Sequence, residues 1–391
     1  MKKNESSRSN KSEAQLASRL TRRRLIRSTA RFAAGAVSVL GAPAIVGRAI
    51  PANARTSFAG EGMIVATWSG NHDRLFREMV IGPFNERYDA KLDTIGIWDQ
   101  SVAQIVAAPA DSPPYDVAIA EEFLSSSGLS EQIYLKTDPE KVPNLKHVNP
   151  WFYDLRAEHA KPYGIPFTGG NVAILANTQI GFEPSSWQDF WRPELNRKTT
   201  LDSAGWWFTI AIPAIISGAQ PGVQEIYDPT QTGPLFDQLE QLKPAKWYKD
   251  GAEQTYLMLQ EEALMAMVYT TDAYALLLEA GNRFTLTVPT EGTPGWTDWF
   301  FKIRGTPHAD LADAFLNYVL ELDTQNRFLS RTLQFMSRSD VTVPSHWKNY
   351  PHTREDFERM IYLLTIEGWD SLLANWEALD KRFKEVVTKT G

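Results

Sequence analysis

The sequence predicts an α/β protein built as two lobes, each a mainly parallel sheet flanked by helices, and three observations lead to this prediction. The 337 residues that follow the first 54 are enough for two hydrophobic cores rather than one. Short apolar runs rich in β-forming residues alternate with helical patterns between residues 63 and 120. The same alternation returns in the second half of the chain, and alternating strands and helices are typical of parallel α/β sheets.

The first α/β block begins at an apolar run that starts with Met63. Pro83 predicts a break or kink in the first helix, because proline has no backbone N–H for the hydrogen-bond ladder. Right-handed crossovers place the loops that follow these strands together on one edge of the sheet. The predicted strands cover residues 63–67, 91–97 and 115–120, and the predicted helices cover residues 73–88 and 101–107.

A glycine-rich stretch at residues 163–170 runs into a predicted strand at 172–176, and we interpret it as the chain crossing from one lobe to the other. The alternative is a phosphate-binding loop, but no Lys-Ser or Lys-Thr follows Gly170.

A tryptophan-rich helical tail ends the chain. In the second block the predicted helices cover residues 187–192, 252–262, 272–280 and 311–320, and the predicted strands cover residues 263–269, 284–289 and 296–303.

The first 54 residues have the pattern of a bacterial export signal. Residues 21–27, Thr-Arg-Arg-Arg-Leu-Ile-Arg, match the twin-arginine motif, and an apolar stretch too short to anchor the chain in a bilayer follows. Residues 52–54 have the small-x-small pattern of a signal-peptidase site, with residues 42–44 as a second candidate. A basic arm that binds nucleic acid does not explain this order of features. We therefore predict a twin-arginine signal peptide at residues 1–54, folding in the cytoplasm and release into the periplasm.

The composition excludes several classes of protein. The chain has no cysteine, which excludes disulfides, iron–sulfur clusters and thiolate metal sites. After residue 54 there are 29 basic and 45 acidic residues, and a formal charge of −16 repels nucleic acid. This charge would attract a cationic solute weakly, although a simpler reason for it is the solubility of an exported protein. We expect no nucleic-acid partner.

Familiar catalytic and cofactor motifs are absent from the sequence. There is no Gly-x-Ser-x-Gly elbow of a hydrolase and no Gly-x-Gly-x-x-Gly dinucleotide motif. None of the six histidines forms the i, i+4 pair that binds zinc on a helix. We therefore expect a protein that is not an enzyme and has no metal or cofactor, although distant residues could still assemble a catalytic site.

Five groups of short motifs, taken in their order and spacing, make the chain after residue 63 resemble the periplasmic solute-binding proteins of ABC importers, in the spermidine/putrescine-binding group. The resemblance covers nearly the whole chain after the signal segment. Its motifs are Ala66-Thr67-Trp68 with Pro83-Phe84, Pro114-Tyr115-Asp116-Val117, Tyr163-Gly164-Ile165-Pro166-Phe167 with Asn177, Ser186-Trp187-Gln188-Asp189-Phe190-Trp191-Arg192-Pro193-Glu194, and Glu291-Gly292 with Trp296-Thr297-Asp298.

The resemblance implies a two-lobed periplasmic-binding-protein fold of type II, similar to cluster D, with short hinge crossings and a ligand between the lobes. We accordingly assign residues 55–171 with 297–343 to lobe I and residues 172–296 with 344–391 to lobe II. The implied partners are a small-molecule ligand, an ABC permease in the inner membrane and, during export, the twin-arginine translocase. We expect a monomer whose lobes close over the ligand, because some contacts form only when the lobes meet around it.

The resemblance also implies which residues contact the ligand. Trp68, Tyr269 and Trp296 match aromatic positions, whose rings would flank a polyamine chain. Asp298 matches a carboxylate that meets an ammonium group. Trp206 stands where polyamine binders keep a glutamate, and Glu121 is the candidate that replaces this carboxylate. The other candidates are Glu122, Asp202, Asp272 and Phe335.

Structural roles remain open for several of these residues. Asp202 and Asp272 are also candidates for helix caps, and Trp206 for packing inside a lobe. The function implied by the resemblance is capture of a small cationic or amine-bearing, polyamine-like solute and its delivery to a permease. The alternatives are an exported enzyme that uses the same cleft, a sensor that presents its ligand to a receptor, and a binder of a non-cationic solute.

Overall fold

The computed structural model describes residues 57–391, except residues 99, 155, 220–223, 344–346, 348–349, 352 and 365. The predicted export signal and both candidate cleavage sites lie outside the described residues. Residues Arg55–Gly391 group into one compact unit. Within the described part of the chain, no helix has both the length and the apolar character needed to cross a membrane.

The first α/β block matches the predicted order of elements, and the strand at 91–97 and the helix at 101–107 have the predicted bounds. The predicted helix at 73–88 is interrupted by a π-helical segment, in which the N–H of Gly82 donates to the carbonyl of Arg77, five residues back. Pro83, which follows, has no N–H to donate, so the predicted irregularity is confirmed. The elements are β1 (Gly62–Trp68), α3 (Asn71–Phe76), η2 (Arg77–Ile81), α4 (Gly82–Tyr88), β2 (Lys91–Ile97), α5 (Ser101–Ala107), β3 (Val117–Glu121), α6 (Glu122–Ser130), η3 (Pro143–His147) and α7 (Trp151–Asp154).

Two long strands, β4 (Ile165–Asn177) and β9 (Thr293–Lys302), join the two halves of the fold. The first part of β4, up to Asn171, pairs with β9, and from Val172 onward it pairs with β7 and β8. The predicted crossing near residue 170 is therefore confirmed. A Cβ atom on Gly169 would lie 1.9 Å from the Phe335 ring, so this stretch needs glycine because aromatic rings pack directly on its backbone.

The second α/β block and the C-terminal segments follow the same alternation. Between the two crossing strands lie η4 (Thr178–Ile180), η5 (Trp187–Trp191), η6 (Pro193–Leu195), β5 (Thr199–Asp202), α8 (Trp206–Ile216), η7 (Gln224–Tyr227), α9 (Gly233–Leu239), β6 (Lys246–Tyr248), α10 (Gly251–Leu259), β7 (Met265–Tyr269), α11 (Thr270–Ala280), η8 (Gly281–Arg283) and β8 (Phe284–Thr287). After β9 come α12 (Ala309–Val319), α13 (Leu322–Leu329), β10 (Phe335–Met336), α14 (Arg354–Met360), β11 (Ile361–Tyr362), α15 (Ile366–Ala374) and α16 (Trp376–Thr390).

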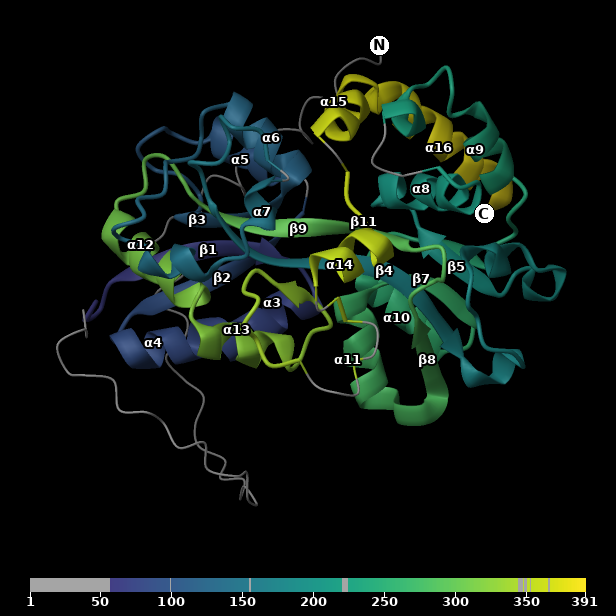
Figure 1. The fold of residues 1–391 in the computed structure, drawn as a ribbon, viewed down its shortest axis with the longest axis horizontal. Coiled ribbons are helices and arrows are strands. Elements are labelled where there is room, and N and C mark those ends of the chain that lie inside the picture. The colour runs from purple at the N-terminus through teal and green to yellow at the C-terminus, as the bar shows by residue number, and fades with distance from the viewer. Residues whose placement is uncertain are drawn as a thin grey trace, which may run out of the picture. The chain divides into compact units, whose positions relative to one another are not determined.

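The strands follow the order β2-β1-β3-β9-β4-β7-β5-β6. β1, β2 and β3 are mutually parallel, as are β5, β6 and β7, whereas the crossing strands β4 and β9 are antiparallel to each other. Figure 1 shows helices on both sides of the strands in each half: α3, α4 and α13 face α5, α6 and α7, and α10 and α11 face α8 and α16. The predicted α/β fold of sheets flanked by helices is confirmed. The sheet as a whole is mixed rather than mainly parallel, because β9 also runs antiparallel to β3 and β4 runs antiparallel to β7 and β8.

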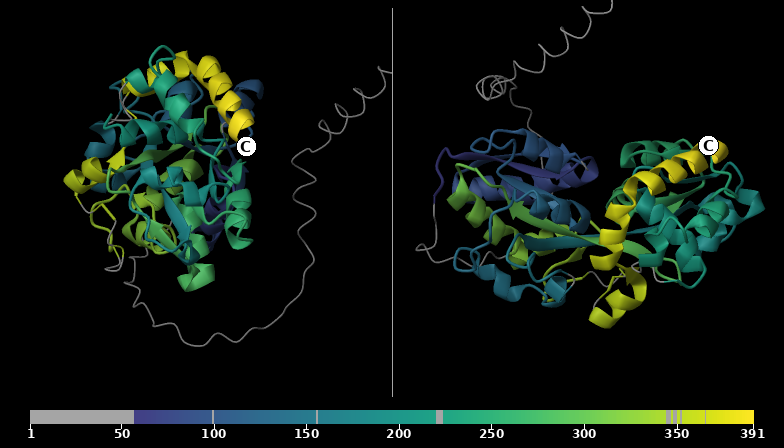
Figure 2. Two further views of the ribbon diagram at one scale, coloured as in Figure 1. Left: turned by 90° about the vertical axis from the view of Figure 1, so that its right-hand side faces the viewer. Right: turned by 90° about the horizontal axis from the view of Figure 1, so that it is seen from above.

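The buried side chains form separate hydrophobic clusters, which define the two lobes. One cluster contains core residues between Phe58 and Phe167 together with residues between Trp299 and Ile361, and we call this part lobe I. Two further clusters contain core residues between Val172 and Phe284, joined by Trp369 to Val386 from the C-terminal helices, and we call this part lobe II. Figure 2 shows α15 and α16 lying along the helices of lobe II.

Two of the motifs that carry the family resemblance contact each other and have a structural role. One carboxylate oxygen of Glu291 accepts hydrogen bonds from the Trp187 backbone N–H at 2.6 Å and from the Ser186 hydroxyl at 2.7 Å. The Trp187 side chain is fully buried, and its indole N–H donates to the Gly292 carbonyl at 3.0 Å. These contacts hold the segment before η5 against the turn that leads into β9.

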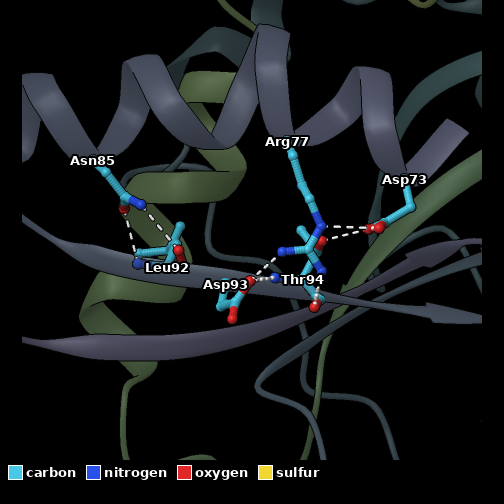
Figure 3. A network of polar contacts seen from close by, with 6 residues as sticks. All are labelled: Asp73, Arg77, Asn85, Leu92, Asp93 and Thr94. Atoms are coloured by element: carbon cyan, nitrogen blue, oxygen red, sulfur yellow. Dashed lines mark hydrogen bonds and ion pairs between the residues drawn. The ribbon is translucent and has the colours of Figure 1, made fainter. Parts of the chain in front are cut away.

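Polar side chains from the first helices form hydrogen bonds with backbone groups of the edge strand β2 (Figure 3). Among the described strands, β2 pairs with β1 alone. The Asn85 amide donates to the Leu92 carbonyl at 2.9 Å and accepts from the Leu92 N–H at 2.8 Å. Arg77 donates to the Thr94 carbonyl and to Asp93, and its Nε lies 2.9 Å from Asp73 Oδ2. Because unpaired backbone groups on an edge strand invite pairing with other chains, these contacts protect the edge as well as attach the helices.

We expect Asn85→Ala to lower the free energy of unfolding by about 1–3 kcal/mol, because it leaves the N–H and carbonyl of Leu92 without partners. Urea unfolding followed by circular dichroism measures the change. Glu86→Ala, at an exposed position on the same helix, is the matched control and should change stability little. Equal unfolding midpoints for the two variants would contradict the assigned role of Asn85.

Candidate ligand-binding site

Four of the predicted site residues lie at the carboxyl ends of parallel strands. Trp68 ends β1 and Glu121 ends β3 in lobe I, whereas Asp202 ends β5 and Tyr269 ends β7 in lobe II. Ligands of open α/β sheets bind outside these strand ends, because the loops and helix N-termini that follow the strands meet there. The positions therefore agree with a site that receives residues from both lobes.

Asp298, on the crossing strand β9, is the centre of the hydrogen-bonded group in lobe I. Its Oδ1 accepts from the Trp68 indole N–H at 2.8 Å, and its Oδ2 accepts from the Trp296 indole N–H at 3.2 Å. Oδ2 also accepts from the Thr168 hydroxyl at 3.2 Å and from the Gln334 amide at 3.3 Å. One carboxylate thus holds two tryptophan side chains in fixed orientations.

Burial dominates the electrostatics of Asp298. Its side chain has no exposed surface, and this desolvation raises the pKa of Asp298 to about 6, although the four donors oppose the rise. All four donors are neutral groups, so they stabilise the ionised carboxylate less than a charged partner would. The carboxylate therefore gains its proton in mildly acidic solution.

The corresponding group in lobe II is built on Asp202 and Tyr269. The Tyr269 hydroxyl donates to Asp202 Oδ2 at 2.6 Å, and the backbone N–H groups of Ala204 and Gly205 donate to the same carboxylate. Burial raises the pKa of Asp202 to about 6. Gly205 is the N-cap of α8, so Asp202 is not the helix cap that the sequence left open and instead holds the turn before the helix.

Aromatic rings connect the two groups across the crossing strand. The Trp296 ring centroid lies 5.3 Å from that of Tyr269, in an edge-to-face arrangement, and 5.5 Å from that of Phe208. On the other side, Trp68 lies 6.1 Å from Trp98. Such ring pairs stabilise one another by about 0.5–1.5 kcal/mol beyond their buried area. The rings of Trp68, Trp296 and Tyr269 are half-buried, so each keeps some surface that a ligand can contact.

Asp272 links the two lobes directly. It lies in the first turn of α11, where the helix dipole favours a carboxylate, but Tyr269 is the N-cap of that helix. Asp272 Oδ1 accepts from the side-chain amide of Asn71, at the start of α3 in lobe I, at 3.1 Å. Burial raises the pKa of Asp272. This hydrogen bond joins the two lobes where α3 and α11 meet.

The two predicted glutamates have different surroundings. Glu121 is buried and lies beside Asp298 in the register of β3 and β9. Glu122 accepts from the Thr297 hydroxyl at 3.2 Å, and its other oxygen lies 3.5 Å from Nε of the buried Arg156. Burial raises the pKa of Glu122 despite the charge of Arg156. A small pocket at this position is lined by Glu122, Gly295, Trp296, Thr297, Leu363, Leu364 and Trp369.

Trp206 and Phe335 are packed among other aromatic side chains. Trp206 is 2% exposed, and its ring lies 5.1 Å from Trp376 and 6.2 Å from Phe383 in the core of lobe II. Phe335 lies 4.7 Å from Phe357. These surroundings favour packing within a lobe over contact with a ligand for both residues.

Sequence reasoning missed Trp98, whose side chain is 43% exposed beside Trp68. A tryptophan directly after a predicted strand end was the signal that could have found it, because strand ends form the site in this class of fold. Sequence reasoning also missed Asn71, Thr168 and Gln334. Single polar residues of this kind have no recognisable pattern until the fold brings them to a carboxylate.

Comparison with known proteins agrees with this fold. The family model described as "Bacterial extracellular solute-binding protein" matches residues 80–355, and the chain belongs to this family. The prediction of a solute-binding protein rather than an enzyme is thereby confirmed at the level of the family. The resemblance stated from the motifs is confirmed as well.

The individual relatives are only distantly similar to this chain in sequence. The chain is 24% identical over 246 residues to the spermidine/putrescine-binding periplasmic protein 1 of Haemophilus influenzae, covering 62% of this chain and 63% of the relative. It is 25% identical over 163 residues to the gamma-aminobutyric acid-binding protein of Pseudomonas aeruginosa, covering 40% of this chain and 45% of the relative. The matches thus span less than two thirds of the length of either relative.

Among solved structures, the spermidine/putrescine ABC transporter substrate-binding protein PotD from Streptococcus pneumoniae is similar in fold. It superposes with a TM-score of 0.68 over 84% of this chain and all of that chain, at 17% sequence identity. At this identity the likeness concerns the fold, which is that of the periplasmic binding proteins.

We expect Asp298→Asn to change how stability depends on pH. Burial raises the pKa of Asp298 from 3.8 to about 6 on folding, so ionisation favours the unfolded chain, and wild-type stability falls as the pH rises through this window. A rise of this size corresponds to about 3 kcal/mol. Urea unfolding between pH 4 and pH 7 should show the variant gaining up to ~3 kcal/mol relative to wild type.

Any cost of placing an amide beside the two indole N–H groups is the same at every pH, so only the pH-dependent part of the difference is diagnostic. A stability difference that stays constant from pH 4 to pH 7 would contradict the raised pKa.

Proposed function

We propose that this protein is the substrate-binding component of an ABC importer, which captures a small cationic or amine-bearing organic solute between its lobes and delivers it to a permease in the inner membrane. Membership of the solute-binding family supports the binding role. The observation that carries the proposal is the gathering of buried carboxylates and half-exposed aromatic rings from both lobes at the strand ends around Asp298 and Asp202. The names of the two relatives, a polyamine binder and a gamma-aminobutyric acid binder, support an amine-bearing solute.

Within this site we assign different roles to the predicted residues. Trp68, Trp296 and Tyr269 form aromatic walls, and Asp272 supplies negative charge where the lobes meet. Asp202, Glu121, Glu122 and Asp298 add negative charge beneath the walls and hold neighbouring side chains. Trp206 and Phe335 support the site by packing beneath it rather than by contact with the solute.

We propose that the two lobes move as bodies about β4 and β9. Lobe I comprises residues 55–171 and 297–343, and lobe II comprises residues 172–296 and the C-terminal helices. Trp347, Phe357 and Ile361 move with lobe I rather than with lobe II, because these side chains pack in the lobe I cluster. Closure then depends on contacts such as Asn71–Asp272, which exist only when the lobes meet.

We further propose that the protein reaches the periplasm through the twin-arginine pathway and acts there as a monomer. The motif at residues 21–27, the apolar stretch after it and the small residues at 52–54 support this route. The excess of acidic residues after residue 54 is compatible with a protein that attracts organic cations.

Thermal unfolding with a panel of solutes tests the proposed function. At hundredfold excess over its dissociation constant, a cationic or amine-bearing solute should add about 2.7 kcal/mol to the free energy of unfolding. Trp296→Ala should lose this response, and Tyr256→Ala, at an exposed position on α10, should keep it. Stabilisation by sugars or dicarboxylates with none from any amine would overturn the cationic assignment.

The export route makes a separate prediction. Changing Arg22 and Arg23 together to Lys should retain the protein, uncleaved, in the cytoplasm of a bacterium that has a twin-arginine translocase, because the translocase reads the arginine pair. Cell fractionation with immunoblotting measures the distribution, and Arg27→Lys serves as the conservative control outside the pair. Efficient export of the double variant would exclude this pathway.

A further inference from the structure

We propose that the site selects a fully substituted ammonium group, such as a trimethylammonium head, and holds it against the ring faces of Trp68, Trp98, Trp296 and Tyr269. In this proposal Asp298 and Asp202 are positioning residues, which orient the rings and do not contact the solute. The inference deepens the proposed function and rests on it, because it names the chemical class of the solute that the same site would take.

The aromatic rings and the two acids differ in their exposure to solvent. Asp298 is 0% exposed and Asp202 is 1% exposed, whereas Trp98 is 43% exposed. Trp68, Trp296 and Tyr269 are half-buried, so part of each ring is accessible. A solute that enters the site therefore meets aromatic faces first and reaches these two carboxylates only if protein groups move aside.

Hydrogen-bond donors of the protein occupy both buried carboxylates. Both oxygens of Asp298 accept hydrogen bonds, from the Trp68 indole on one side and from three neutral groups, including the Trp296 indole, on the other. Both oxygens of Asp202 accept as well, and the shortest of these bonds comes from the Tyr269 hydroxyl. A primary ammonium needs acceptors for its three N–H groups and would have to displace these donors, which costs hydrogen bonds inside a buried site.

The two buried carboxylates fix the orientation of the rings. Trp68 and Trp296 donate to opposite oxygens of one carboxylate, and Trp296 packs edge-to-face with Tyr269, so the three rings are oriented by two acids. Trp98 extends the aromatic surface beyond Trp68. A cation over an aromatic face is attracted by the negative ring face, and the attraction is stronger when the contact is desolvated.

A fully substituted ammonium group fits this surface because it has no N–H and a weakly hydrated, apolar exterior. Its charge requires no direct ion pair here. Asp272 is half-buried in the first turn of α11 and supplies a nearby negative charge, and the buried acids beneath the rings add to the field. Accessible rings together with occupied, buried carboxylates favour cations held by ring faces over cations held by hydrogen bonds.

Isothermal titration calorimetry of the purified protein with choline and with ethanolamine tests the proposal. The two probes share one skeleton and differ only in the three methyl groups on nitrogen. We expect choline to bind at least about tenfold more tightly, a difference of about 1.4 kcal/mol. Tighter binding of ethanolamine or putrescine would overturn this inference and leave the proposed function standing, whereas binding of sugars or dicarboxylates alone would overturn both.

Trp98 provides the variant test, because its exposed ring can be changed with little effect on folding. Trp98→Ala should weaken choline binding about fivefold to tenfold and reduce the preference over ethanolamine, and Trp98→Phe should restore most of both, because a phenyl face also attracts cations. Tyr256→Ala, at another exposed aromatic position, is the matched control and should leave choline binding unchanged. Unchanged choline affinity in Trp98→Ala, with an unchanged melting temperature, would contradict the proposal.

Discussion

Two strands that pass through both lobes are the constraint on which the rest of this structure depends. β4 and β9 pair with each other at the crossing, and each also pairs antiparallel with a strand of one lobe, β9 with β3 and β4 with β7. Because each lobe has its own hydrophobic cluster, the crossing strands are where the two cores are joined. Trp296 and Asp298 lie on β9, whereas Trp68, Glu121, Asp202 and Tyr269 end parallel strands of the two lobes. The crossing therefore lies at the centre of the proposed hinge and of the proposed binding site.

Asp298 lies on one of the crossing strands and holds the surrounding side chains by hydrogen bonds. A carboxylate with no exposed surface is unfavourable unless its oxygens are satisfied, and in this fold four neutral side chains satisfy them. The donors come from β1, β4, β9 and the segment before β10, so one buried acid ties together four segments around the crossing. Asp202 likewise ties the turn before α8 to Tyr269 by hydrogen bonds. In both lobes a buried acid orients aromatic rings that remain accessible.

Sequence patterns predicted the order of elements well, because each pattern depends on local physical chemistry. The edge strand Lys91–Ile97 and the helix Ser101–Ala107 have the bounds that apolar spacing indicated, and Pro83 marked an irregular helix. The resemblance to the solute-binding family, rather than these local patterns, implied that Trp68, Tyr269, Trp296 and Asp298 belong to one site. For Trp206 the sequence left open both contact with the ligand and packing inside a lobe, because a tryptophan in the core and a tryptophan at a site have the same local signature.

The sequence by itself determined the class of fold, the crossing between the lobes and the residue types available for binding, because strand and helix periodicity and glycine placement act over a few neighbouring residues. Only the tertiary structure decided what each acid contacts. Whether a carboxylate meets a solute or an indole N–H depends on residues far apart in the chain, as the Trp68–Asp298 and Asn71–Asp272 hydrogen bonds show. Such contacts leave no local pattern, since each partner is an ordinary polar or aromatic residue until the strands bring them together.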